Sequence, residues 1–163
     1  MGVSRAVLSL GLVASVAWMS ACALGVESKT PNAMIGRWEL NRGRSHYGGG
    51  AAPRARETMV CEATADGIRC RIRSERNEGR VLTASFVARD DGTRAPVTGF
   101  PDEDEVRLVR VDDWITDATF YSRGRPVFAY RAVLSGDRKS LTIVSVDPAT
   151  RAALHSVIVY DAR

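Results

Sequence analysis

Apolar and polar side chains alternate along most of the chain after residue 34. The alternation is clearest in four segments, at residues 82–86, 114–120, 128–134 and 154–160. Successive side chains of a β-strand point to opposite sides, so a period of two is typical of strands with one apolar face. The pattern therefore predicts strands whose apolar faces turn toward a common core.

Short turns separate these segments at regular intervals. Residue pairs that contain Asp, Gly or Pro begin at positions 66, 78, 91, 101, 112, 123, 136 and 147. Successive turns therefore start 10 to 13 residues apart. This spacing leaves room for strands of about 6 to 9 residues and none for a helix of ordinary length. Eight turns join nine strands, and an apolar segment at residues 34–40 adds one more.

About ten antiparallel strands in sequential order predict an all-β fold. A twisted meander of this size closes on itself because closure removes the exposed edge strands. We therefore expect an antiparallel up-and-down β-barrel of about 8 to 10 strands, formed by residues 34–163. A flattened β-sandwich is the alternative arrangement of the same strands.

The first residues of the chain have the features of a signal peptide. Arg5 is the only charged residue before Glu27, and the apolar stretch 6–18 follows it. This length matches the apolar region of a secretory signal. We therefore assign residues 1–21 to export and residues 22–33 to a polar tether that leads to the folded domain.

The segment Met19-Ser20-Ala21-Cys22 resembles the lipobox of bacterial lipoproteins, in which the cysteine is lipid-modified and begins the mature chain. The resemblance implies lipid attachment at Cys22 and a membrane anchor in the cell envelope. Because Ala23 is not the Asp that is typical of inner-membrane retention, we expect an outer-membrane lipoprotein that faces the periplasm. The alternative is ordinary cleavage after Ala23, which gives a periplasmic or secreted protein.

Either kind of processing leaves Cys61 and Cys70 as the unmodified cysteines, because Cys22 is either acylated or removed. A turn at residues 64–67 places them directly opposite each other, on the same face of a hairpin. Exported proteins form disulfides in oxidising compartments, so we expect a Cys61–Cys70 bond that staples this hairpin. Redox catalysis and metal binding are disfavoured, because the cysteines are nine residues apart and no histidine is near in sequence.

The triplet Gly36-Arg37-Trp38 lies at the start of the first predicted strand and resembles the G-x-W signature of lipocalins and related calycins. Over about residues 35 to 160 the chain resembles uncharacterised lipocalin-like proteins of bacterial envelopes. The segments that carry this similarity are 36–41, 45–47, 66–68, 96–99 and 159–160. The resemblance implies a lipocalin-like barrel, with the Trp at its bottom and an interior that holds a ligand. It implies neither a substrate nor catalytic residues.

Charge and motif content narrow the functional classes. The net charge is +4, but 23 Lys and Arg residues lie among 19 Asp and Glu residues, so we expect no nucleic-acid partner. No apolar run reaches the roughly 18 to 20 residues of a membrane-spanning helix, which excludes a multipass membrane protein. His46 and His155 accompany no catalytic motif, and the acidic run 102–105 lacks the spacing of a calcium loop. We expect no catalytic residue, no metal and no cofactor.

The barrel interior is the place where a ligand would bind. The expected inward set mixes large and small side chains, which can leave a cavity or interdigitate into a packed core. Both outcomes stay open. Arg110 shares the parity of Leu108, so its cation needs a ligand carboxylate, an Asp or Glu of the protein, or exposure beyond the strand end. The candidate ligand-binding residues are Trp38, Phe86, Arg110, Trp114, Phe120, Phe128 and Tyr130.

Two functions fit these features. The first is an exported, lipid-anchored barrel that binds or sequesters a small apolar or amphipathic molecule and catalyses no reaction. The second is a packed barrel that acts as a structural or protein-interaction module of the envelope. An enclosed apolar cavity of roughly 300 Å³ or more favours the first over the second. The sequence does not determine the oligomeric state.

Overall fold

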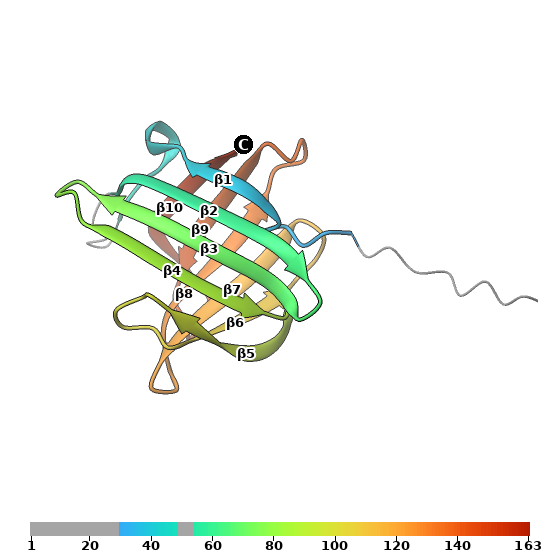
Figure 1. Cartoon of the computed structure of the whole chain (residues 1–163). Coiled ribbons are helices and arrows are strands. Elements are labelled where there is room, and N and C mark those ends of the chain that lie inside the picture. The colour runs from blue at the N-terminus through green and yellow to red at the C-terminus, as the bar shows by residue number, and fades with distance from the viewer. Residues whose placement is uncertain (1–29, 49–53) are drawn as a thin grey trace, which may run out of the picture.

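The computed structural model describes residues 30–48 and 54–163. The predicted signal peptide, Cys22 and the tether up to residue 29 lie outside the described residues. The described chain forms ten strands and one short 3-10 helix, η1 (Figure 1). In chain order these are β1 (Gly36–Leu40), η1 (Arg42–Arg44), β2 (Arg54–Thr64), β3 (Gly67–Arg76), β4 (Val81–Ala88), β5 (Asp91–Thr98), β6 (Glu105–Arg110), β7 (Ile115–Ser122), β8 (Arg125–Leu134), β9 (Ser140–Val146) and β10 (Ala153–Ala162).

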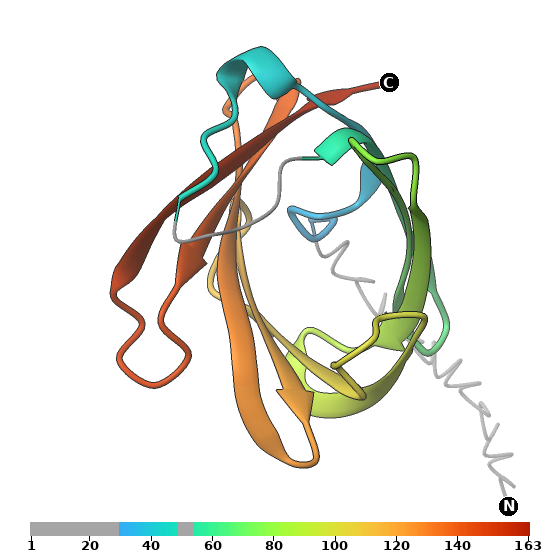
Figure 2. The same cartoon turned by 90° about the vertical axis from the view of Figure 1, so that its left-hand side faces the viewer.

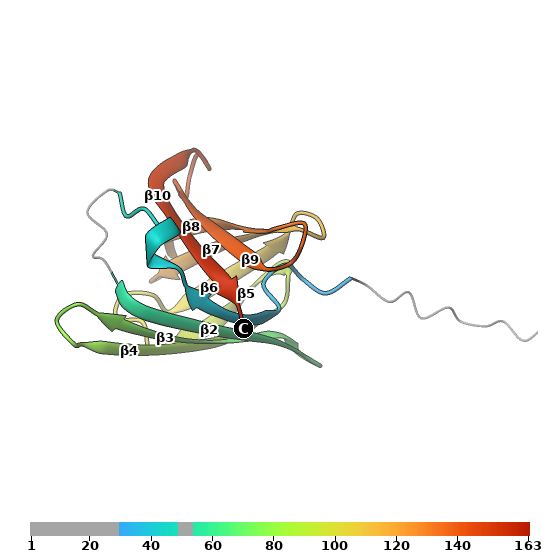
Figure 3. The same cartoon turned by 90° about the horizontal axis from the view of Figure 1, so that it is seen from above.

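The ten strands close into one antiparallel barrel, as the turn spacing predicts. Each strand pairs with its neighbours in sequence, and β1 pairs with β10 to complete the ring. Seen from above, β2, β3 and β4 form one wall and β7 to β10 the opposite wall (Figure 3). The alternative of a flattened β-sandwich is therefore wrong, and the architecture is compatible with a lipocalin-like fold.

The turns lie close to where local composition places them. Seven of the eight predicted turns fall between consecutive strands, the first of them shifted by one residue because Gly67 begins β3. The exception is the pair Asp91-Gly92, which lies inside β5, while the turn before β5 lies at Arg89–Asp90. Gly92 adopts a φ of +90° next to a shift in the β5–β6 register. A glycine of this kind marks a β-bulge as readily as a turn, and the local sequence does not distinguish them.

One end of the barrel is sealed by the chain segment that precedes β1. The Trp38 indole Nε1 donates a hydrogen bond of 2.8 Å to the Met34 carbonyl oxygen. The Asn32 side-chain oxygen accepts from the Met34 amide at 2.9 Å and from the Thr116 hydroxyl at 3.0 Å. Asn32 also donates to the Asp90 carboxylate. Because Met34 and Thr116 are fully buried, the packed domain begins at about Asn32. Figure 2 shows this blue segment inside the ring of strands.

The Gly36–Trp38 pair has a direct steric explanation. Gly36 adopts a φ of +151°, which L side chains rarely adopt. A Cβ atom at this position would also lie 2.9 Å from Cζ2 of the Trp38 ring. The strand therefore needs glycine where the ring folds back under the barrel. Trp38 is 2% exposed and lies at the bottom of the barrel, where the lipocalin resemblance places it.

The cysteine hairpin has the predicted register. Cys61 pairs with Cys70 and Met59 pairs with Ile72 across β2 and β3. The two cysteines form a disulfide, and both are buried in the core. The connecting turn is shorter than the predicted four-residue loop, because the β2–β3 ladder continues to Thr64 and Gly67. Among the described residues, no helix is long and apolar enough to cross a membrane.

We predict that the Cys61–Cys70 bond stabilises the barrel by roughly 2 to 3 kcal/mol, because it closes a loop of about ten residues in the unfolded chain. The measurement is urea unfolding with and without a thiol reductant. Reductant should lower the free energy of unfolding of the wild-type protein by that amount. It should leave the C61A/C70A double variant unchanged. Equal stability of the oxidised and reduced wild-type proteins would contradict the prediction.

Candidate functional site

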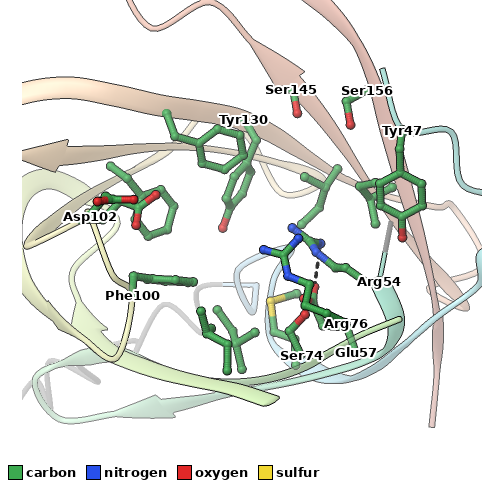
Figure 4. A pocket seen from close by; sticks show the side chains of 18 of the residues that line it. Tyr47, Arg54, Glu57, Ser74, Arg76, Phe100, Asp102, Tyr130, Ser145 and Ser156 are labelled. Carbon is green, nitrogen blue, oxygen red and sulfur yellow. Dashed lines mark hydrogen bonds and ion pairs between the residues drawn. The ribbon is translucent and has the colours of Figure 1, made fainter. Parts of the chain in front are cut away.

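A cavity of about 350 Å³ lies in the half of the barrel away from the sealed end. This volume is at the lower end of the range of about 300 to 1,000 Å³ for ligand pockets. The cavity lies between β2 and β3 on one side and β7 to β10 on the other, and the β5–β6 loop borders its mouth (Figure 4). Its apolar lining consists of Met59, Ile72, Leu82, Phe100, Pro101, Phe120, Phe128, Ile143 and Ile158.

Aromatic rings form much of one wall of the cavity. Phe120 is their centre, with ring centroids of Phe100, Phe128 and Tyr130 at 5.6, 6.0 and 5.9 Å. Phe86 lies behind it, edge-on at 6.2 Å. Ring pairs at these distances and tilts attract one another beyond the apolar area that they bury. The cluster therefore gives the cavity a rigid apolar wall.

Three polar side chains, from β2 and β10, form a connected cluster at the cavity, the Glu57 cluster. Arg54 Nη1 donates to Glu57 Oε1 at 2.9 Å and to the Tyr160 hydroxyl oxygen at 3.2 Å. The Tyr160 hydroxyl donates a short hydrogen bond to the same Glu57 oxygen. Glu57 is 6% exposed and Tyr160 is 2% exposed. A buried carboxylate is costly unless it is paired and hydrogen-bonded, and the cluster meets both conditions.

The cluster favours a neutral Tyr160 beside the ion pair of Arg54 and Glu57. Burial raises the pKa of the Tyr160 phenol well above its usual value, and the negative charge of Glu57 raises it further. Burial also raises the pKa of Tyr130, with a smaller contribution from Glu57. For Arg54, burial is the largest single effect and disfavours the cation, but Glu57 and two neighbouring tyrosines together outweigh it, so the pKa is raised. Both phenols therefore stay protonated and Arg54 stays charged in the folded protein.

A β-bulge brings Arg54 to the cavity. Glu57, Met59 and Cys61 are the inward residues of β2, and strict alternation from them points position 54 outward. The register shifts between Arg54 and Arg56, so that Arg54 lies opposite Arg76 of β3. An extra residue in one strand re-aims the side chain beyond it. The guanidinium thus reaches Glu57 and lines the cavity.

Two buried hydroxyl groups at the cavity have no hydrogen-bond partner among residues 30–48 and 54–163. They belong to Ser74 of β3 and to Tyr47, which follows η1. Ser74 is 4% exposed and lies opposite Glu57 in the ladder. Burial raises the pKa of the Tyr47 phenol, against the opposing effect of Arg54. Because a buried polar group without a partner costs stability, these hydroxyls suit a site where a ligand supplies the partner.

The mouth of the cavity has a basic side and an acidic side. Arg54 and Arg76 extend from β2 and β3, and Asp102 lies across the mouth, in the β5–β6 loop (Figure 4). Glu103 of the same loop also lines the cavity, and burial raises the pKa of its carboxyl group. The mouth is thus polar and charged, whereas the interior is apolar.

Three of the seven candidate ligand-binding residues line this cavity. These are Phe120, Phe128 and Tyr130. Phe128 is 36% exposed at the mouth, whereas Phe120 and Tyr130 are buried. Phe86 does not contact the cavity but packs against Phe120. Alternation along the strands therefore identified part of the aromatic wall.

The other three candidates lie at the sealed end. Trp38 closes the barrel there, as described above. The Arg110 guanidinium is 11% exposed and pairs with Asp113 at 2.5 Å, so its anionic partner belongs to the protein. Trp114 precedes β7 and is 41% exposed, with the Arg138 guanidinium 5.5 Å from its ring centre. These residues are not brought together with the aromatic wall.

The polar residues of the cavity were not among the ligand-binding residues predicted from the sequence, although strand alternation indicates that most of them face inward. Glu57, Ser74, Arg76 and Tyr160 each share the parity of buried apolar neighbours on their own strand. Tyr160 already lies on the apolar face predicted for residues 154–160, and extending the alternation to polar positions would have placed Glu57, Ser74 and Arg76 inside as well. Arg54 carries no such signal, because the bulge reverses its parity.

The described residues contain no group of three or more His, Cys, Asp or Glu residues arranged to hold a metal ion. Comparisons with protein-family models, with curated proteins and with solved structures find no match. The function is therefore argued from the cavity and from the residues around it.

We predict that Tyr130 and Tyr160 ionise only when the barrel opens. Their folded pKa values are raised, so the folded protein keeps protons that the unfolded chain loses at a pH of about 10. The stability that they contribute is complete below that pH and is lost as the pH rises above it. Alkaline titration should show late tyrosinate absorbance that coincides with unfolding by circular dichroism. The Y160F variant should lose one late-titrating group. Reversible ionisation of all four tyrosines in a folded barrel would contradict this.

Proposed function

We propose that the protein binds a small apolar or amphipathic molecule inside its barrel and catalyses no reaction. The observation that carries this proposal is the cavity of about 350 Å³, which combines an apolar aromatic wall with a few buried polar groups. Ligand pockets have this composition because apolar area supplies affinity while a few polar groups fix orientation. Each Å² of apolar ligand surface removed from water contributes roughly 25 cal/mol.

The hydrogen bonds that Glu57 already accepts support ligand binding without catalysis. Glu57 is the buried acidic group of the cavity, and both Arg54 and Tyr160 already donate to it. A general base must reach a proton of the substrate, and this geometry directs Glu57 toward its own neighbours instead. The cluster therefore serves better as a fixed polar surface than as an acid–base pair.

The alternative is a packed barrel that acts as a structural or protein-interaction module of the envelope. The cavity of about 350 Å³ is open at its mouth rather than enclosed, but packed protein interiors have few voids larger than a water molecule, so its size still favours ligand binding over this alternative. Membership of a lipocalin-like family is part of the same proposal. The steric fit of Gly36 against the Trp38 ring at the barrel bottom supports it.

We also propose that the protein is exported and anchored at Cys22 to the outer membrane, facing the periplasm, with a periplasmic or secreted form as the alternative. The buried Cys61–Cys70 disulfide supports an oxidising compartment. The described chain enters the barrel at its sealed end, where Asn32 bonds to Thr116 and Asp90. An anchor that precedes this segment would leave the cavity mouth at the end away from its attachment.

A neutral apolar fluorophore, N-phenyl-1-naphthylamine, tests the binding proposal. We predict saturable binding at one site, with increased fluorescence as water is excluded from the dye. The S145F variant should weaken binding by more than about tenfold, because Ser145 lines the cavity. The matched control is V144F, since Val144 is the outward neighbour on β9. Equal binding by S145F and V144F would place the dye outside the cavity.

The anchor has a separate test. We predict that the C22S variant, expressed with its signal peptide in a Gram-negative host, moves from the membrane fraction to the soluble periplasmic fraction. Removal of the lipid-accepting thiol removes the acyl chains that hold the protein to the bilayer. Fluorophore binding by the released protein should equal that of the wild type, which shows that the barrel is intact. Unchanged fractionation would refute lipid attachment at Cys22.

A further inference from the structure

Two arginines from neighbouring strands lie side by side at the cavity mouth. Arg54 of β2 and Arg76 of β3 are direct cross-strand partners, and both line the cavity. Figure 4 shows their guanidinium groups extending into the same part of it. Like charges on residues directly opposite each other destabilise the pairing of the two strands. The bulge that turns Arg54 inward creates this arrangement, and regular alternation would have avoided it.

A buried hydroxyl adds a second, independent feature at the same place. Ser74 lies two residues before Arg76 on the inward face of β3 and opposite Glu57 in the ladder. Its hydroxyl is buried and has no hydrogen-bond partner in the part of the chain that the structure describes. The Tyr47 hydroxyl is in the same state and also lines the cavity. Each of these hydroxyls can donate a hydrogen bond to a ligand.

This side of the cavity therefore offers mainly hydrogen-bond donors. Its acceptor, Glu57, already receives bonds from Arg54 and Tyr160. The acidic residues Asp102 and Glu103 line the mouth from the β5–β6 loop, and Figure 4 places Asp102 across the cavity from the two arginines. An anionic group that enters the mouth is attracted to the arginine side and repelled from the loop side. The charges thus set an orientation for a ligand with one anionic end.

We propose that the ligand is an amphipathic molecule with an anionic head group, either a carboxylate or a phosphate. This inference rests on the proposed binding function and names its ligand class. The head group lies between Arg54 and Arg76, whose planar guanidinium groups bind such oxygens in pairs, and it accepts a hydrogen bond from Ser74. The apolar body lies along the aromatic wall, against Phe120 and Phe128. The small cavity volume selects a short apolar body.

Four amphiphiles with the same decyl chain test the proposal: decanoate, decyl phosphate, 1-decanol and decyltrimethylammonium. Each amphiphile is titrated into the complex of the protein with N-phenyl-1-naphthylamine, at concentrations below those at which it aggregates, and displacement of the dye is measured. We expect the two anions to bind at least about tenfold more tightly than the alcohol, because their hydrogen bonds to the arginines are charge-assisted and therefore stronger. The cation should bind most weakly. The tighter of the two anions identifies the head group as a carboxylate or a phosphate.

The matched variants are R76Q and R73Q. Arg76 faces the cavity, whereas Arg73 is exposed on the outer face of the same strand. R76Q should weaken binding of the preferred anion by about tenfold and leave 1-decanol binding unchanged. R73Q should change neither. Arg54 is not replaced, because its loss would leave Glu57 buried without its cation. Added salt provides a check that needs no variant, since it should weaken the binding of the anions and not the binding of the alcohol.

The outcomes separate this inference from the binding function itself. If 1-decanol or the cation binds as tightly as the anions, or if R76Q and R73Q behave alike, the anionic head group is wrong and the binding function stands. If the fluorophore and all four amphiphiles fail to bind to a folded protein, the binding function fails and this inference falls with it. Selective loss of anion binding in R76Q supports both.

Discussion

Closure of the sheet between its first and last strands is the constraint on which the rest of the structure depends. The seam is short, running from the pair Trp38–Ala162 to the pair Leu40–Tyr160. Because it removes both sheet edges, the apolar faces of all ten strands enclose one interior. The segment before β1 then seals one end through Trp38 and Met34, and the cavity lies in the other half of the barrel. Without the seam, neither the sealed bottom nor the cavity would form.

The polar groups of the cavity carry energetic costs that an apolar core avoids. Glu57 is buried, and Arg54 and Tyr160 offset the cost of removing its charge from water. Ser74 has no such compensation within the described chain. Two arginines are also direct neighbours across β2 and β3. A barrel optimised for stability alone would place apolar side chains at these positions. The proposed ligand binding would give a single physical reason for all three departures.

The sequence predicted more of the fold than of the candidate site. Seven turn positions and the strand count followed from local composition and alternation, because each depends on residues close in sequence. Closure followed from the strand count, since a meander of this size removes its edges by closing, although the seam itself joins residues far apart in sequence. The Cys61–Cys70 pairing followed in the same way, since the register of a hairpin is set by its own turn. For the site, alternation identified inward aromatic residues such as Phe120. It could not indicate at which end of the barrel each one lies, and Arg110 and Trp114 lie at the end without the cavity.

The sequence by itself determined an all-β chain of ten short strands, one stapled hairpin and the apolar face of each strand. These are properties of neighbouring residues, and a period of two or a turn pair expresses them directly. Only the tertiary structure decided which inward residues share a cavity, because that depends on how ten strands are staggered around the ring. It also decided the environment of Glu57. A single bulge, with no distinctive local sequence, turns Arg54 inward to Glu57 three residues away, and Tyr160 of β10 reaches the same carboxylate across the barrel.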